Sequence, residues 1–130
     1  MSEIMYERIS KKIDSASEEI KALALSLHKH PELAFQEHFA CEALTEILEK
    51  YGYKTRKNIA GMDTAFIGEA KGREGGPVVA ILAEYDALPM GHACGHNLIA
   101  AMSIGAAIGI GEVLKELCGR VLVIGTPAEE

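Results

Sequence analysis

Three apolar segments that follow one another in the second half of the chain constrain its fold most. Residues 78–83 and 121–124 are short and fully apolar, and residues 97–117 between them would be apolar around nearly the whole of a helix. A short continuous apolar run is typical of a strand that is covered on both faces. We therefore expect two parallel strands joined by a right-handed crossover helix, whose Gly105 and Gly109 would allow close approach to the sheet. This unit predicts an α/β fold with a mostly parallel sheet.

The first half of the chain predicts two helices and a strand. Apolar residues recur at steps of three and four along residues 2–28, which indicates one long amphipathic helix. His30-Pro31 ends this helix, because a residue before proline avoids the helical backbone conformation. A second helix is expected over residues 37–51, and residues 64–67 are expected to form a strand.

The composition excludes several classes of function. The 130 residues are enough for one domain and carry a net charge of −6, so the chain has no basic surface for nucleic acid. The longest apolar run, residues 98–111, has 14 residues, which is shorter than the roughly 18–20 that cross a bilayer. Three cysteines without an export signal predict free thiols in a reducing compartment, and hence a cytoplasmic protein.

Side chains that can bind a metal ion follow both apolar strands. In open α/β sheets, ligands bind beyond the carboxyl ends of the strands. The second strand leads to Glu129 and Glu130. The first strand leads to five such residues: Glu84, Asp86, His92, Cys94 and His96.

The spacing of these residues favours a metal site with its own base. Cys94 and His96 are two residues apart on a glycine-containing loop, so both can turn toward one ion. Thiolate and imidazole suit zinc and other late divalent metals, while carboxylates also accept manganese. The adjacent carboxylates of Glu129 and Glu130 do not ionise easily side by side without a cation. One of them can bind metal while the other accepts a proton, which is the division of labour in metal-assisted hydrolysis.

Each of these residues also has a purely structural interpretation. Cys94 by itself would fit a small buried residue, and the pair Glu129-Glu130 would fit a solvated terminus. Asp86 fits a cap of the following turn as well as a residue that orients a metal ligand. His92 is expected to be structural or to support a ligand rather than to bind the ion.

Four motifs carry a resemblance to a known family. They are LHKHPEL at residues 27–33, AEYDALP at 83–89, GHACGHN at 91–97 and GTPAEE at 125–130. In this order they resemble the aminoacylase/carboxypeptidase metallopeptidases (peptidase family M20). The similarity is to its amidohydrolase branch, which includes aminobenzoyl-glutamate hydrolase and β-alanyl-lysine dipeptidase.

The resemblance implies a site with two divalent metal ions, zinc or manganese first, with cobalt and nickel as alternatives. By matching position it implies that Cys94, His96 and Glu130 are metal ligands and that Glu129 is the general base. Asp86 falls at the acidic position of its motif, near the site. We therefore take Glu129 and Asp86 as the candidate catalytic residues.

The resemblance also implies an architecture and a substrate. The family fold predicts a three-layer sandwich, in which residues 1–130 are the amino-terminal portion of the catalytic domain. The dimerisation domain and two further histidine ligands would lie outside these residues, and the full-length parent would be a homo-oligomer. The implied reaction is metal-dependent hydrolysis of the amide bond of dipeptides or N-acyl amino acids, with no nucleic acid or membrane as partner.

Two other functions stay open. The first is an amidohydrolase that acts on aryl-amide or auxin-like conjugates. The second is an inactive remnant that acts as an interaction module through an exposed sheet edge. We expect residues 1–130 alone to bind metal weakly, to hydrolyse little and to expose apolar strand edges.

Overall fold

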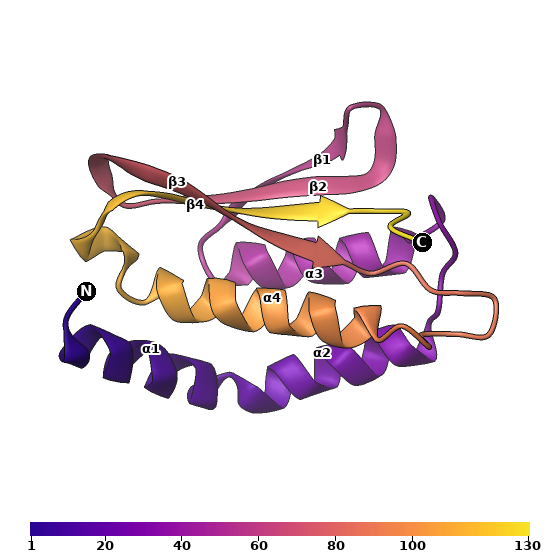
Figure 1. Ribbon diagram of the computed structural model, residues 1–130, viewed down its shortest axis with the longest axis horizontal. Helices are drawn as coiled ribbons and strands as arrows, with labels where there is room; N and C mark the ends of the chain where they lie inside the picture. The colour runs from indigo at the N-terminus through magenta and orange to yellow at the C-terminus, as the bar shows by residue number, and fades with distance from the viewer.

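The computed structural model describes residues 1–130 as a four-stranded sheet with its helices on one face (Figure 1). The elements in chain order are α1 (Glu3–Ser15), α2 (Ser17–Lys29), α3 (His38–Lys50), β1 (Lys54–Ile59), β2 (Met62–Lys71), β3 (Arg73–Glu84), α4 (His96–Gly111), the 3-10 helix η1 (Leu114–Glu116) and β4 (Cys118–Thr126).

The predicted strand–helix–strand unit is present as β3, α4 and β4. β3 and β4 pair in parallel, in a register that runs from Val78 opposite Arg120 to Glu84 opposite Thr126. The helix is shorter than residues 97–117, because the chain turns after Gly111 and forms η1 before β4. The α/β class is therefore confirmed, and both strands end at the same edge of the sheet.

The expectation of a mostly parallel sheet is wrong. The strand order is β1-β2-β4-β3, and both other pairings, β1 with β2 and β2 with β4, are antiparallel. The physical reason is the length of the connections. Short turns join β1 to β2 and β2 to β3, so each of these consecutive strands reverses direction, whereas β3 and β4 are joined by a long crossover and run parallel. Because β4 runs parallel to β3, it must run antiparallel to β2. The expected strand over residues 64–67 lies within β2, and its charged partner β1 was not predicted.

The layers also differ from a sandwich with helices on both faces of the sheet. α3 and α4 pack against one face, and α1 and α2 pack on α4 from below, so the other face of the sheet is open (Figure 1). Gly109 of α4 approaches helix α1 rather than the sheet, since a Cβ atom there would lie 2.7 Å from Ile13 Cδ1. Gly105 likewise approaches Ile20 of α2, so these two glycines serve helix–helix packing.

The long helix expected over residues 2–28 is divided in two. α1 ends at Ser15, and α2 begins at Ser17 after the buried Ala16. The predicted apolar stripe is present on both halves, with Leu23 and Leu27 buried. The bend lets one stripe follow α4 along its length (Figure 1).

β3 is an edge strand, so the expectation that residues 78–83 are covered on both faces is wrong. The exposed fractions of Val78, Val79 and Leu82 are 52%, 51% and 54%. In β4, Val121 and Val123 are buried on the helix side, while Leu122 on the open face is only half-buried. Exposed apolar strand edges were expected and are confirmed. None of the helices combines the length and apolar composition needed to cross a membrane.

Candidate metal centre

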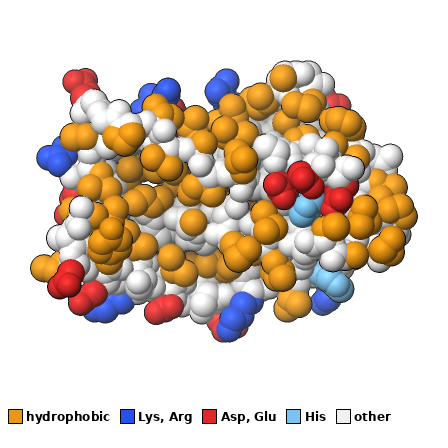
Figure 2. Space-filling model, in the orientation of Figure 1, with side chains coloured by type: hydrophobic (Ala, Val, Ile, Leu, Met, Phe, Trp, Pro, Cys, Tyr) orange, Lys and Arg blue, Asp and Glu red, His pale blue; other side chains and the backbone are white.

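The candidate site lies where β3 and β4 end and α4 begins. Glu84 is the last residue of β3, His96 is the first residue of α4, and Glu129 follows β4 by three residues. In Figure 2, acidic side chains gather around a histidine on the side where the C-terminus lies in Figure 1. The carboxyl edge of the two parallel strands thus collects the polar side chains, as the sequence predicted.

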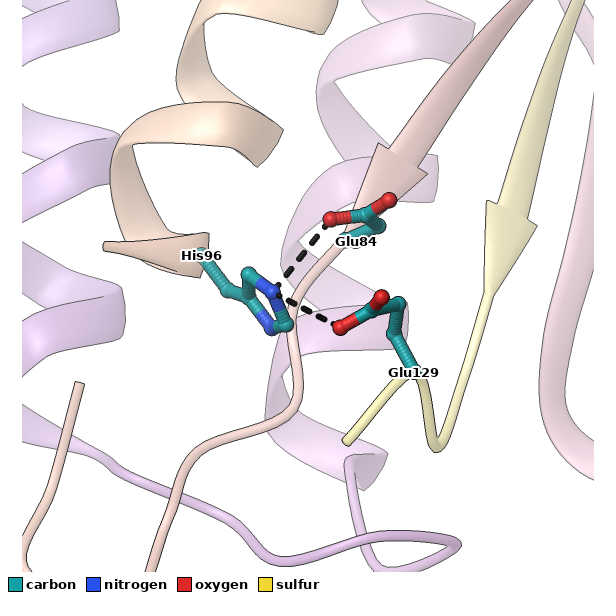
Figure 3. A group of neighbouring side chains, drawn as sticks. All are labelled: Glu84, His96 and Glu129. Atoms are coloured by element: carbon teal, nitrogen blue, oxygen red, sulfur yellow. Dashed lines mark ion pairs between the residues drawn. The ribbon is translucent and has the colours of Figure 1, made fainter. Parts of the chain in front are cut away.

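His96 is the centre of this cluster. Its Nε2 atom lies 3.3 Å from Glu84 Oε2 and 3.4 Å from Glu129 Oε2, the two contacts drawn in Figure 3. Glu130 Oε1 is slightly farther from the same nitrogen, at 3.8 Å. Single donor atoms of Glu84, His96 and Glu129 all lie within 4.8 Å of one another. Such a set of one imidazole and two carboxylates is suited to a divalent cation.

The other nitrogen of His96 is held by Asp86. His96 Nδ1 lies 2.9 Å from both the backbone oxygen and Oδ1 of Asp86. A backbone carbonyl can only accept, so Nδ1 carries a hydrogen, and Nε2 is the nitrogen that is left to bind a metal ion or, when protonated, to pair with the carboxylates. A carboxylate or carbonyl behind an imidazole is the arrangement that orients a histidine for metal binding. Asp86 itself is buried and does not face the open side of the cluster.

The electrostatics of the cluster favour positive charge. Burial lowers the pKa of His96, but its contacts with Asp86 and the nearby Glu84 outweigh burial, so the net pKa is raised. A side-chain hydrogen bond with Glu130 is the largest cause that raises the pKa of the Cys94 thiol. Several carboxylates around one imidazole and one thiol make a strongly negative site, which a cation would relieve.

The structure brings some of the predicted site residues into contact with one another and leaves others at the margin. His96, Glu129 and Glu130 meet at one point, and Asp86 supports it from behind. Cys94 is exposed and is not one of the three residues whose donor atoms lie within 4.8 Å of one another, while Glu130 is the neighbour that most raises the pKa of its thiol. The assignment of Cys94, His96 and Glu130 as metal ligands, and of Glu129 and Asp86 as catalytic residues, stays a prediction.

Glu84 and His92, which the sequence also places at this edge, differ in their relation to the cluster. Glu84 was placed at this edge but was not predicted as a ligand. Its position as the last residue of an apolar strand was the available signal. His92 lies outside the acidic group and its Nδ1 atom has no hydrogen-bond partner. Burial is the largest cause that lowers the pKa of His92.

The segment that carries the two glutamates is fixed by hydrogen bonds on both sides. Thr126 Oγ1 donates to the backbone oxygen of Ala83 at 3.1 Å, which ties the ends of β4 and β3 together. The backbone N–H of Glu130 donates to Asp86 Oδ2 at 2.9 Å. Asp86 therefore touches both His96 and the backbone of Glu130. It couples the position of the His96 ring to that of Glu129 and Glu130, called the glutamate pair below.

The chain has relatives among characterised hydrolases, although no family model matches it. It is 40% identical over 142 residues to the Xaa-Arg dipeptidase of Mus musculus, with 98% of this chain and 33% of the relative covered. It is 39% identical over 119 residues to the N-acetylcysteine deacetylase of Bacillus subtilis, with 80% of this chain and 31% of the relative covered.

A solved structure agrees with these relatives. The crystal structure of the Bacillus subtilis YXEP protein, a dinuclear metal-binding peptidase of the M20 family, is 34% identical with a TM-score of 0.80. That match covers 89% of this chain and 36% of the other. The resemblance noted in the four motifs is therefore confirmed. Over most of its length the chain is homologous to the M20 peptidase family, and it spans about a third of the length of these relatives.

Proposed function

We propose that residues 1–130 supply part of an active site for metal-dependent hydrolysis of an amide bond in dipeptides or N-acyl amino acids. The observation that carries the proposal is the orientation of His96. Asp86 holds its Nδ1 atom, so that Nε2 points at Glu84 and Glu129. We further propose that these residues are the amino-terminal portion of a catalytic domain whose remaining part, with a dimerisation domain, completes the site in a homo-oligomer.

The donor set is compatible with two divalent ions, zinc or manganese first, with cobalt and nickel as alternatives. His96 and Glu130 would hold them together with Cys94, and Glu84 lies close enough to His96 Nε2 to join this set. When bound, the ions would polarise the substrate carbonyl and lower the pKa of water at the site. Thiolate, imidazole and carboxylate donors together suit such ions.

The residues of the chain would divide the remaining work. Glu129, whose side chain is 49% exposed, can reach a water molecule on the open side of the cluster. It would take a proton from that water as the amide carbonyl is attacked, and would then give the proton to the leaving amine nitrogen. Asp86 would keep the His96 ring in one tautomer and one orientation throughout.

The names of the relatives support the substrate class. One is a dipeptidase and the other removes an acetyl group from an amino acid, and both reactions cleave an amide bond.

The rival function from another class, an interaction module, is favoured by one observation. Val78, Val79 and Leu82 expose an apolar edge along β3, and such an edge is suited to contact with another protein surface.

The test uses the complete gene product and measures metal content and hydrolysis together. Metal is quantified by plasma mass spectrometry, and turnover is followed on dipeptides, N-acyl amino acids and aryl-amide conjugates. We expect two metal equivalents and turnover of the first two classes. Glu129→Gln should keep the metal and lose about 10²–10⁴-fold in kcat, whereas Cys94→Ala should lose metal.

Two results would contradict the proposal. Hydrolysis that persists after complete removal of metal would rule out a metal-dependent reaction. A protein that binds no metal and cleaves none of the three substrate classes would instead favour the interaction module.

A further inference from the structure

We propose that Glu37 is a positioning residue that holds the backbone of the glutamate pair in place. Glu37 is the residue directly before α3, and it lies 91 positions from Ala128 in the sequence. It is fully buried, at 0% exposure. A glutamate is almost never buried in this way unless its oxygens are satisfied, so its partners indicate its role.

The carboxyl group of Glu37 joins three separate parts of the chain. Its Oε1 atom accepts the backbone N–H groups of Phe35 at 3.0 Å and of Ala128 at 2.9 Å. Its Oε2 atom accepts the hydroxyl of Thr64, in β2, at 2.8 Å. One buried side chain thus connects the loop before α3, the sheet and the segment after β4.

The contact with Ala128 matters because that residue has an unfavourable backbone conformation. Ala128 has a φ of 58°, in the left-handed region that side chains other than glycine rarely adopt. Such a conformation persists only where the surroundings fix it. The hydrogen bond that the Ala128 N–H donates to Glu37 supplies that constraint directly at the strained residue.

Two buried carboxyl groups therefore hold alternate amides of one short segment. Glu37 accepts the N–H of Ala128, and Asp86 accepts the N–H of Glu130. Glu129 lies between the two fixed amides, with its carboxylate 3.4 Å from His96 Nε2. If either amide were released, the backbone could rotate and carry Glu129 and Glu130 away from His96.

Glu32 offers a matched control in the same loop. Its two carboxylate oxygens accept the N–H groups of Phe39 and Ala40, both at 2.9 Å, at the start of α3. Its side chain makes no hydrogen bond with residues 126–130. Loss of Glu32 should therefore destabilise the fold without moving the glutamate pair.

The functional part of this inference rests on the proposed metal site. In the complete gene product we would compare Glu37→Ala, Glu37→Gln and Glu32→Ala by cobalt(II) titration, by the visible absorption of bound cobalt, and by kcat and KM. Glu37→Ala is expected to weaken cobalt affinity and to lower kcat by about tenfold or more, within the range seen when residues behind metal ligands are lost. KM should change less than kcat.

The glutamine variant is expected to recover most of the loss. Its Oε1 atom can still accept the amides of Phe35 and Ala128, and its Nε2 group can donate to the Thr64 hydroxyl. Glu32→Ala should lower the melting temperature but leave cobalt affinity and absorption unchanged. Equal losses of affinity in Glu37→Ala and Glu32→Ala, or a glutamine variant no better than alanine, would overturn the proposal. If Glu37→Ala does not fold, Glu37→Met replaces it, since methionine fills the space without accepting the amides.

A readout that needs no metal separates the positioning role of Glu37 from the proposed function. Wild-type protein that takes up no cobalt would refute the metal site, and hydrogen exchange of the Ala128 amide would then decide the positioning role. Protection at Ala128 that is lost in the alanine or methionine variant of Glu37 and kept in Glu32→Ala supports that role. Equal protection in all of these proteins overturns it.

Discussion

Asp86→Asn is expected to weaken metal binding although it hardly changes the shape of the side chain. Asp86 accepts two hydrogen bonds at 2.9 Å, from His96 Nδ1 through Oδ1 and from the backbone of Glu130 through Oδ2. Asparagine has one oxygen and one NH₂ group, so it can accept only one of them. In either orientation the NH₂ group faces an N–H donor. If it faces His96, it also opposes the tautomer that leaves Nε2 free.

The size of the effect follows from these two contacts. Leaving a buried donor unsatisfied costs roughly 1–3 kcal/mol. That cost lowers stability with or without metal, while metal affinity falls because the His96 ring is no longer held in the binding orientation. Loss of a partner behind a metal-binding histidine typically lowers metal affinity about 10–100-fold. We therefore expect the dissociation constant for cobalt(II), measured by calorimetry on the complete gene product, to rise about 30-fold.

Asp14→Asn is the matched control, because Asp14 is exposed near the end of α1, which packs against Gly109 at the opposite end of α4 from His96, so its substitution removes the same charge away from the site. It should change the cobalt affinity by no more than about twofold, which is within about 0.4 kcal/mol. An Asp86→Asn protein that binds cobalt within about threefold of the wild type, with an unprotonated His96 Nε2 by ¹⁵N NMR, would show that Asp86 does not orient the ring.

Three further predictions concern stability and association. The Lys50 hydrogen bond is the largest cause that lowers the pKa of Glu19 below its ordinary 4.5, so the Glu19 carboxylate should stabilise the fold above pH 4.5 and lose this effect as the pH falls through the lowered pKa. Urea unfolding of wild type and Glu19→Gln should therefore differ near neutral pH and converge in acid. Gly125→Ala would place a Cβ atom 2.2 Å from Phe66 Cε1; since Phe66 is fully buried, we expect a loss of about 1–3 kcal/mol or more in chemical unfolding, and an unchanged midpoint would refute this. Leu82→Glu, at an exposed edge position, should reduce self-association of residues 1–130 in sedimentation without lowering the melting temperature.

The place of the candidate site was predictable because it depends on one simple relationship. Two strands joined by a crossover helix run parallel, so the residues after Ala83 and after Ile124 had to meet at one edge. This relationship alone places His96 and Glu129 at the same edge of the sheet. The exact partners of His96 were less predictable. The approach of Glu84 to His96, and the position of Cys94 outside the group formed by Glu84, His96 and Glu129, depend on side-chain geometry that spacing does not specify.

The sheet order and the role of Glu37 were not predictable, for different reasons. An apolar run such as residues 78–83 indicates a strand that favours burial, but it does not say which segment covers it, and here β3 lies at an edge. Glu37 looks like an ordinary acidic residue at the start of a helix. Its decisive partner, Ala128, lies 91 positions away, where no local pattern can indicate it.

The position of β4 in the sheet has a consequence for folding during synthesis. β4 is the fourth strand in chain order, yet it lies between β2 and β3 and is the only strand that pairs with β3. While a ribosome makes the chain, the backbone of β3 lacks its partner strand until residues 118–126 have emerged, and its unpaired N–H and C=O groups are open to other chains during that time. Pairing of β4 between β2 and β3 then completes the sheet and places Glu129 and Glu130 next to His96 in the same step. The site therefore forms only when the last strand of the sheet is in place.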